Sequence, residues 1–201
     1  MKDKEKTDII LRALREHFTS WNRDRTNLLF PELRLGSGYC GVAQRRIDMF
    51  VISSNKGNPT IAYEIKVSRG DFKKDVNDDL KQRGARLYAN EFYYVTPKGL
   101  LNPTEIPLWA GLMELDIDAF INGKGVYFDT PVPAPLHPKA MPSWGLICSL
   151  IRKIDKEEQL EQLRSEYEVQ IKKLKSENFD LRQKNSRYAF KLLQNGVKDF
   201  E

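Results

Sequence analysis

Two charged residues break an otherwise apolar segment of the chain. In IAYEIKVS, residues 61–68, Glu64 and Lys66 stand two positions apart. Side chains alternate between the two faces of a strand, so Glu64 and Lys66 share one face and the flanking apolar residues share the other. An acid and a base on one face fit either an exposed ion pair, which contributes little to stability, or the wall of an active site.

Asp48 bears on this choice because it lies in the preceding segment, RRIDMFVI. If residues 46–52 and 61–67 pair as a hairpin, Asp48 comes near Glu64. Two close carboxylates repel each other unless a divalent cation lies between them, and Mg²⁺ is commonly held by one or two carboxylates together with substrate phosphates. A neighbouring lysine can then activate a water or stabilise charge that builds on a phosphate. The combination predicts metal-dependent hydrolysis of a phosphodiester.

Asp48 followed by Glu64-Ile65-Lys66 resembles the PD-(D/E)xK nuclease superfamily, whose signature is an acid, a short spacer and then E-x-K on the second strand of a hairpin. A longer ordered set over roughly residues 28–116 resembles the MmcB-like DNA-repair proteins: RRIDMFVIS, YEIKVSRGDFKKD, ANEFYYVTPKGLL and IPLWAGLMELD. The superfamily signature has a proline before the first acid, where this sequence has Ile47.

The resemblance implies a restriction-endonuclease-like fold and a role for each matching residue. Asp48 and Glu64 would bind Mg²⁺ or Mn²⁺, helped by the backbone carbonyl of Ile65, and Lys66 would be the catalytic lysine. Superfamily members also draw accessory groups from neighbouring elements. The candidates here are Glu16, Glu32 and Gln82, each of which is equally compatible with an ordinary surface residue.

Contacts with DNA are expected from residues on either side of the signature. Ser68 and Arg69 match the polar run that follows the lysine in the MmcB-like proteins, and Arg69 would bind a phosphate. Arg45 and Arg46 precede Asp48 in the sequence, where their charges could meet a phosphate backbone.

The elements around the signature predict an α/β fold with a mixed sheet flanked by helices. Helical periodicity covers residues 7–19 and 71–90, and strand-like composition covers 46–52, 61–67, 91–97, 109–116 and, more weakly, 125–129. Residues 1–130 are therefore expected to form the nuclease-like domain. Five prolines within residues 131–142 predict a stiff linker.

Residues 143–201 are predicted to form a long helix, because the region is rich in Glu, Lys, Gln and Leu and has no proline. Apolar residues recur at steps of three and four, with a stutter between Tyr167 and Ile171, which favours a dimeric coiled coil. Asn178 and Asn185 fall in the same heptad position as Ile171, where a polar residue can fix register. A single solvated helix or a helical hairpin is the alternative, and the pattern does not choose between parallel and antiparallel strands.

Composition limits the function classes without selecting one. A net charge of +5 in 201 residues is compatible with a nucleic-acid partner. The two cysteines, Cys40 and Cys148, are far apart and are expected to be reduced thiols in a cytoplasmic protein. No signal peptide or membrane-spanning run is expected, so no membrane partner is predicted.

The sequence thus predicts a metal-dependent nuclease that hydrolyses DNA, in repair, restriction or the processing of phage or mobile-element DNA, and that dimerises through its C-terminal helix. Endonuclease and exonuclease activity are both compatible with it. The alternatives are a DNA-binding subunit of a repair complex that does not cleave, and a scaffold whose function is the coiled coil.

Overall fold

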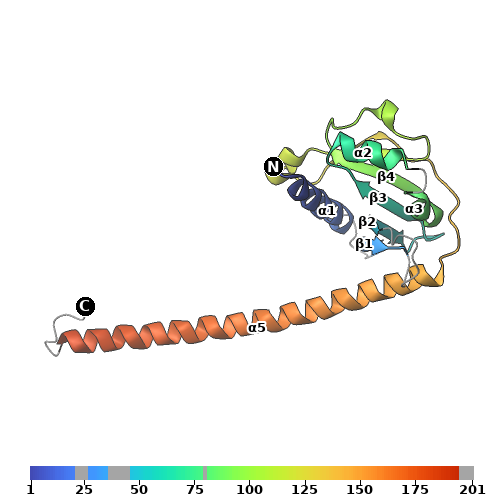
Figure 1. Ribbon diagram of the computed structural model, residues 1–201. Coiled ribbons are helices and arrows are strands. Elements are labelled where there is room, and N and C mark those ends of the chain that lie inside the picture. Colours follow the sequence, from blue (N-terminus) through green and yellow to red (C-terminus); the bar gives the residue numbers. More distant parts are fainter. Residues whose placement is uncertain (21–26, 36–45, 79–80, 195–201) are drawn as a thin grey trace. The chain divides into compact units, whose positions relative to one another are not determined.

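The computed structural model describes residues 1–20, 27–35, 46–78 and 81–194. The chain divides into two compact units, Met1–Lys153 and Ile154–Glu201, which are described separately. The first unit contains the sheet and all the residues of the predicted nuclease signature (Figure 1).

A six-stranded mixed sheet forms the centre of the first unit, with its strands in sequence order. The strands are β1 (Asn27–Arg34), β2 (Arg46–Ser53), β3 (Thr60–Ile65), β4 (Glu91–Pro97), β5 (Gly111–Leu115) and β6 (Phe128–Val132). The pairs β3–β4 and β4–β5 are parallel, and the other three pairs are antiparallel. The predicted hairpin of β2 and β3 and the predicted α/β class with a mixed sheet are confirmed.

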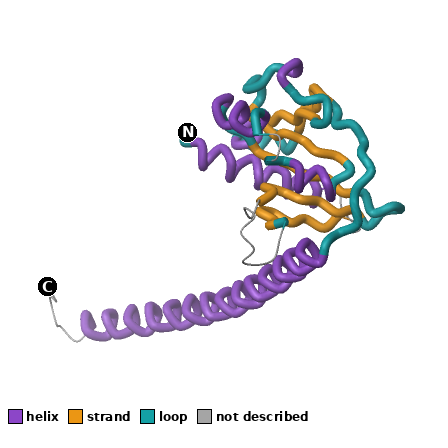
Figure 2. Tube along the Cα trace, turned by 45° about the vertical axis from the view of Figure 1, so that its right-hand side comes forward, coloured by secondary structure: helices purple, strands orange, loops and turns teal. Residues whose placement is uncertain are grey.

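Helices cover both faces of the sheet, as Figures 1 and 2 show. Helix α1 (Asp3–Ser20) packs its Ile10, Ala13 and Leu14 against one face, together with α4 (Ile117–Ile121). Helices α2 (Arg69–Val76) and α3 (Arg83–Tyr88) lie on the opposite face, in a second apolar cluster. A short 3₁₀ helix, η1 (Pro103–Glu105), lies between β4 and β5.

The prediction of one helix over residues 71–90 is wrong, because α2 ends at Val76 and α3 begins only at Arg83. The backbone N–H of Asn77 still donates to Lys73 O at 3.1 Å and closes the last turn of α2. The sequence then reads Asn-Asp-Asp, residue types whose side chains compete for backbone hydrogen bonds and disfavour helix interiors. Asp75 and Gln82, on either side of the interruption, are both buried, and the Gln82 side chain donates a hydrogen bond to Asp75 at 2.8 Å.

Two strands differ from the sequence prediction. Strand β1 was not predicted, and β6 begins at Phe128 rather than at residue 125 and continues through Pro131 into the expected linker. Proline is tolerated there because β6 is the last strand of the sheet, where one side needs no ladder donor.

Helix α5 (Trp144–Gln194) confirms the predicted long C-terminal helix. Its first turns belong to the first compact unit, which extends through Lys153 rather than ending at residue 130. Leu146, only 2% exposed, packs in the same apolar cluster as α2 and α3, with Leu150 against it. Within the described part of the chain, no helix combines the length and the apolar character that crossing a membrane requires.

Candidate active site

The β2–β3 hairpin brings Asp48 and Glu64 onto one face of the sheet. Met49 pairs with Tyr63 and Phe50 with Ala62, and extending this register by one residue sets Asp48 opposite Glu64. An Oδ2 atom of Asp48 accepts a hydrogen bond from the backbone N–H of Ile65 at 2.8 Å, which fixes the carboxylate at the end of β3. The face is the one covered by α2 and α3, so these charged groups lie beneath helices.

Lys66 lies directly beside Glu64 and is almost fully buried. Its Nζ atom donates to Glu64 Oε1 at 2.9 Å, and the two side chains are only 4% and 9% exposed. The backbone N–H of Lys66 donates to Val95 O at 2.9 Å, which holds the residue against β4. The alternative of an exposed surface ion pair is therefore wrong for Glu64 and Lys66.

Burial and mutual charge shift the proton affinities of all three residues. Burial, with a further contribution from the charge of Asp48, raises the pKa of Glu64 to about 7. Burial also raises the pKa of Asp48, against the opposing effects of the Ile65 N–H and of Lys66. Burial alone would lower the pKa of Lys66, yet Glu64, Asp75 and Asp71 raise it above its ordinary value. The site thus concentrates negative charge around one ammonium group.

Glu64 carries an oxygen without a hydrogen-bond partner. Glu64 Oε2 is buried and has no hydrogen bond to any residue that the structure describes. An unsatisfied buried carboxylate oxygen is costly, and next to a second carboxylate it is a position where a divalent cation fits. In the described ranges, no group of three or more His, Cys, Asp or Glu side chains is arranged for a metal. Asp48 and Glu64 would be the two carboxylate ligands of a bound Mg²⁺, a number that leaves positions for water and phosphate.

Asp75 is a residue of the cluster that sequence reasoning did not identify as part of the site. Its side chain has 0% exposure and lies 3.5 Å from Lys66 Nζ, and it also forms an ion pair with Lys81. The Asp75 Oδ2 atom accepts hydrogen bonds from Gln82 Nε2 at 2.8 Å and from Tyr94 Oη at 3.1 Å. Although burial alone would raise the pKa of Asp75, these partners, with Lys81 the strongest, lower it.

Gln82 and Glu32 are two predicted accessory residues that the structure brings close to the cluster. Gln82 is buried and bonded to Asp75. Glu32 lies on β1, raises the pKa of Asp48 through its charge, and forms an ion pair with Arg46 at 3.3 Å. Its φ of 51° is unusual for a residue other than glycine within a strand.

Glu16 is not brought to the cluster. It lies on α1, which packs against the other face of the sheet, and it forms an ion pair with Arg12 at 3.9 Å. The apolar stripe of α1 fixes which sheet face the helix covers, so the structure does not bring Glu16 to the cluster, and its accessory role stays a prediction.

The residues predicted to contact DNA have other partners in this structure. The Oγ atom of Ser68 accepts from the N–H of Asp71 at 3.2 Å and caps α2. Arg69 forms an ion pair with Glu105 at 2.5 Å and donates to Leu100 O at 3.2 Å, but half of its side chain is exposed. Arg46, half exposed, is paired with Glu32, and Arg45 lies outside the described residues.

A small hollow of about 100 Å³ opens beside the cluster. Its lining joins β2, β3 and the start of α3: Leu35, Arg46, Ile47, Glu64, Lys81, Gln82 and Ala85. Two basic residues, Arg46 and Lys81, therefore line the hollow together with Glu64, and each is ion-paired to an acid, Glu32 and Asp75 respectively.

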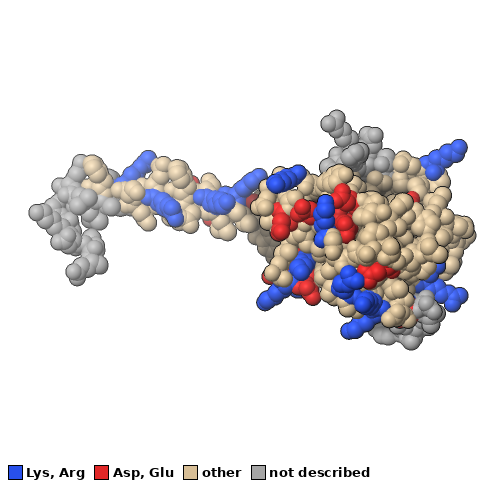
Figure 3. Space-filling view, turned by 90° about the horizontal axis from the view of Figure 1, so that it is seen from above, with Lys and Arg blue, Asp and Glu red and all other residues tan. Residues whose placement is uncertain are grey.

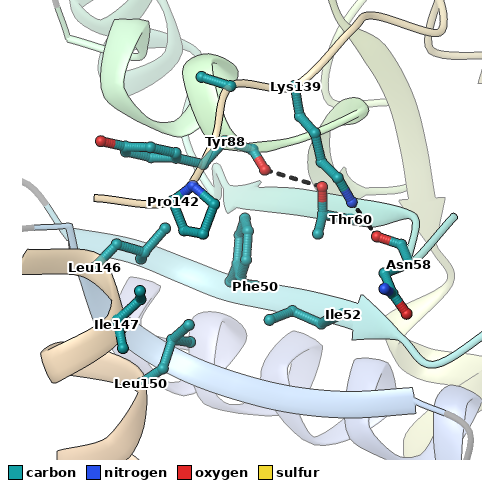
Figure 4. A pocket seen from close by; sticks show the side chains of 11 residues that line it. Phe50, Ile52, Asn58, Thr60, Tyr88, Lys139, Pro142, Leu146, Ile147 and Leu150 are labelled. Atoms are coloured by element: carbon teal, nitrogen blue, oxygen red, sulfur yellow. Dashed lines mark hydrogen bonds between the residues drawn. The ribbon is translucent and has the colours of Figure 1, made fainter. Parts of the chain in front are cut away.

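A larger, mainly apolar hollow of about 260 Å³ lies on the same sheet face (Figure 4). It is lined by Phe50, Ile52, Asn58, Thr60, Tyr88, Lys139, Ala140, Pro142, Leu146, Ile147 and Leu150. Its polar groups are bonded within the fold: Thr60 Oγ1 donates to Tyr88 O at 2.9 Å, and Lys139 Nζ donates to Asn58 O. These lining residues, all within the described part of the chain, include no carboxylate, histidine or cysteine.

Charges of both signs are mixed on the surface of the first unit. On the face shown in Figure 3, the described acidic and basic side chains are interspersed and form no continuous basic patch. Any nucleic acid bound at this face would therefore be positioned by individual side chains rather than by a broad positive surface.

Comparison with known proteins adds little about function. No protein-family model and no curated protein matches the chain. A solved structure with some similarity is a protein of unknown function from Silicibacter pomeroyi, at 20% identity and a TM-score of 0.49, covering 82% of this chain and 92% of that chain. This likeness is too low to assign a fold family or an activity.

Proposed function

We propose that the protein is a divalent-metal-dependent nuclease of the PD-(D/E)xK type, with a restriction-endonuclease-like fold and DNA as its substrate. The observation that carries this proposal is the unpartnered Glu64 Oε2 on a hairpin that also holds Asp48 and Lys66. Burying three charged groups together is costly to folding, and a hydrolytic site gives each of them a role.

The proposed roles follow from the contacts. Asp48 and Glu64 hold Mg²⁺ or Mn²⁺, which when bound polarises a phosphate oxygen and lowers the pKa of a bound water. Lys66, held next to Glu64 and Asp75, keeps its positive charge where negative charge develops on the phosphate. Arg46 lines the hollow beside Glu64 and is half exposed, so it can reach a phosphate on entry.

A DNA-binding subunit that does not cleave is the rival from another class. Such a subunit would need exposed basic residues more than buried acids. In this structure Glu64, Lys66 and Asp75 are buried. On the surface face in Figure 3, acidic and basic side chains are mixed. This contrast supports the enzyme over the binding subunit. A cytoplasmic location is part of the same proposal, and the free thiol of Cys148 is compatible with it.

We also propose that α5 is a coiled-coil segment through which two copies associate. Its exposed apolar residues, among them Ile171, Leu174 and Leu181, are 49%, 62% and 57% exposed in the single chain. The scaffold alternative shares this association but gives no role to the charged cluster under α2 and α3.

Cleavage of DNA with and without metal tests the proposed activity. The purified protein is incubated with linear, nicked, flapped and four-way DNA in Mg²⁺, Mn²⁺ or a chelator. We expect cleavage that requires metal and that falls at least roughly 100-fold in Lys66→Gln and Asp48→Asn. Lys56→Gln, in the exposed turn between β2 and β3, is the matched control and should cleave normally.

The folding of each variant is checked by circular dichroism and thermal unfolding. Cleavage that persists in folded Lys66→Gln and Asp48→Asn proteins would contradict the mechanism. DNA binding without cleavage in any divalent metal would support the non-cleaving subunit instead.

A further inference from the structure

Helix α5 continues through the second compact unit to Gln194, and several of its described apolar side chains there are exposed. Ile171, Leu174 and Leu181 are about half exposed or more, and their spacing of three and seven residues aligns them on one face of α5. A row of exposed apolar residues on an isolated helix requires a covering surface. The polar and charged residues that flank these apolar residues indicate which surface covers them.

The row follows a seven-residue repeat of the coiled-coil type. Ile171, Asn178 and Asn185 occupy the first core position, and Leu174 and Leu181 the second. From this repeat we infer that α5 pairs with α5 of a second copy as a parallel, in-register, two-stranded coiled coil over residues 171–187. Asparagine at the first core position of parallel dimers is a known determinant of register and strand number.

The asparagines favour the parallel orientation. In a parallel, in-register pair each first-position residue faces its own copy, so the amides of Asn178 can hydrogen-bond to each other, as can those of Asn185. In an antiparallel pair first-position residues face second-position residues, so these amides would be buried against leucines such as Leu181. A buried amide without a partner is costly.

The flanking charges favour the same orientation. In a parallel pair Glu177 faces Arg182 of the second copy, five residues further along, and this attraction occurs twice by symmetry. In an antiparallel pair the positions of Lys175 and Arg182 face only each other, so basic groups meet across the interface. The antiparallel register that brings Glu177 near Lys184 also sets Lys175 against Arg182, so it combines an attraction with a repulsion.

Disulfide cross-linking of the full-length chain tests the orientation. Cys40 and Cys148 are replaced by serine, and single cysteines are introduced as Ile171→Cys or Asn185→Cys. In a glutathione redox buffer we expect disulfide-linked dimers from both variants. Gln183→Cys, on the outer face of the repeat, is the matched control and should remain uncross-linked.

Cross-linking at only one of the two core positions overturns the inference, because an antiparallel pair can align at most one of them with itself. Cross-linking at neither, with a monomeric mass by light scattering, also overturns it. The inference rests on the proposed association of two copies through α5, but the cross-linking readout does not depend on nuclease activity, so failure of DNA cleavage leaves this test intact.

A charge exchange provides the second measurement. Glu177→Lys should raise the dimer dissociation constant roughly tenfold by replacing two attractions with two repulsions. Adding Arg182→Glu in the same chain should restore it, since residues five apart on one helix do not face each other. A double variant as weak as the single one would contradict the pairing.

Discussion

Asp75 links the charged cluster to the polar side chains around it. It is fully buried, receives bonds from Gln82 and Tyr94, and forms ion pairs with Lys66 and Lys81. It is too deeply buried to meet DNA directly. We propose that it positions Lys66, whose Nζ atom also lies near Glu64 at 2.9 Å and Asp71 at 3.5 Å.

Asp75→Asn tests this positioning role. The variant keeps the size of the side chain but removes its charge, so we expect turnover to fall about 10–100-fold while KM for DNA is unchanged. Asp71→Asn is the matched control, because Asp71 is also 3.5 Å from Lys66 Nζ but is 54% exposed, and it should change turnover little. Equal effects of the two substitutions would show that burial of Asp75 is irrelevant to catalysis.

Glu64 should also affect how stability depends on pH. Its pKa rises from an ordinary 4.5 to about 7 on folding, so between these values the folded protein holds a proton that the unfolded chain releases. The free energy of unfolding contributed by Glu64 is thus fully present below pH 4.5 and is lost as pH rises through 7.

Relative to Glu64→Gln, the wild-type protein in chelator should therefore lose up to about 3 kcal/mol of stability between pH 5 and pH 8. Urea unfolding of both proteins across this range measures the difference. Burial lowers the pKa of His17, which acts in the opposite direction, but equally in both proteins. Parallel pH profiles would exclude the shift at Glu64.

The sequence alone was sufficient to predict that Asp48, Glu64 and Lys66 lie together on the hairpin. It was not sufficient to predict the residues that surround them. Alternation along β3 and the spacing to Asp48 predict that the acids and Lys66 share a face, because strand geometry is local. Asp75 lies within α2, whereas Lys81, its ion-pair partner, lies between α2 and α3, so the prediction of one helix over residues 71–90 did not place Lys81 beside Asp75. A run of Asn and Asp at residues 77–79 was the available signal.

Among the elements, strands with strong patterns were predictable and the sheet edges were not. β2, β3 and β4 carry β-branched and aromatic residues in regular order. β1 carries Pro31 and the left-handed Glu32, and β6 carries Pro131, so both outer strands lack a regular pattern. These two strands form by pairing with an adjacent strand of the sheet, and this pairing cannot be predicted from the local sequence pattern.

Strand β5 depends on a close backbone contact at Gly111. A Cβ at this position would lie 2.6 Å from the backbone nitrogen of Ala134 and against the ring of Tyr93. Gly111→Ala should therefore lower the free energy of unfolding by about 1–3 kcal/mol, as measured by urea denaturation. Gly70→Ala in α2 is the control, since no atom lies within 4 Å of its added Cβ, and it should be neutral or slightly stabilising.

At the scale of the whole molecule, the two compact units predict separable properties. The buried residues of both apolar clusters lie between Ile10 and Leu146, so a chain ending at Lys153 should fold. Without residues 154–201 it should be monomeric and should convert supercoiled plasmid mainly to nicked rather than linear product. An unchanged ratio of linear to nicked DNA, measured on agarose gels, would show that the helix does not couple the two cuts.

The unpartnered oxygen of Glu64 also affects the stability of the first unit. The oxygen lies under α2 and α3, in the same layer as the apolar cluster of those helices. Burying it without a hydrogen bond therefore lowers the free energy of unfolding of the entire unit. A cation that satisfied it would bind the folded chain and not the unfolded one, and would shift the unfolding equilibrium by mass action. Heat stability would then report how fully the site is occupied, with no DNA present.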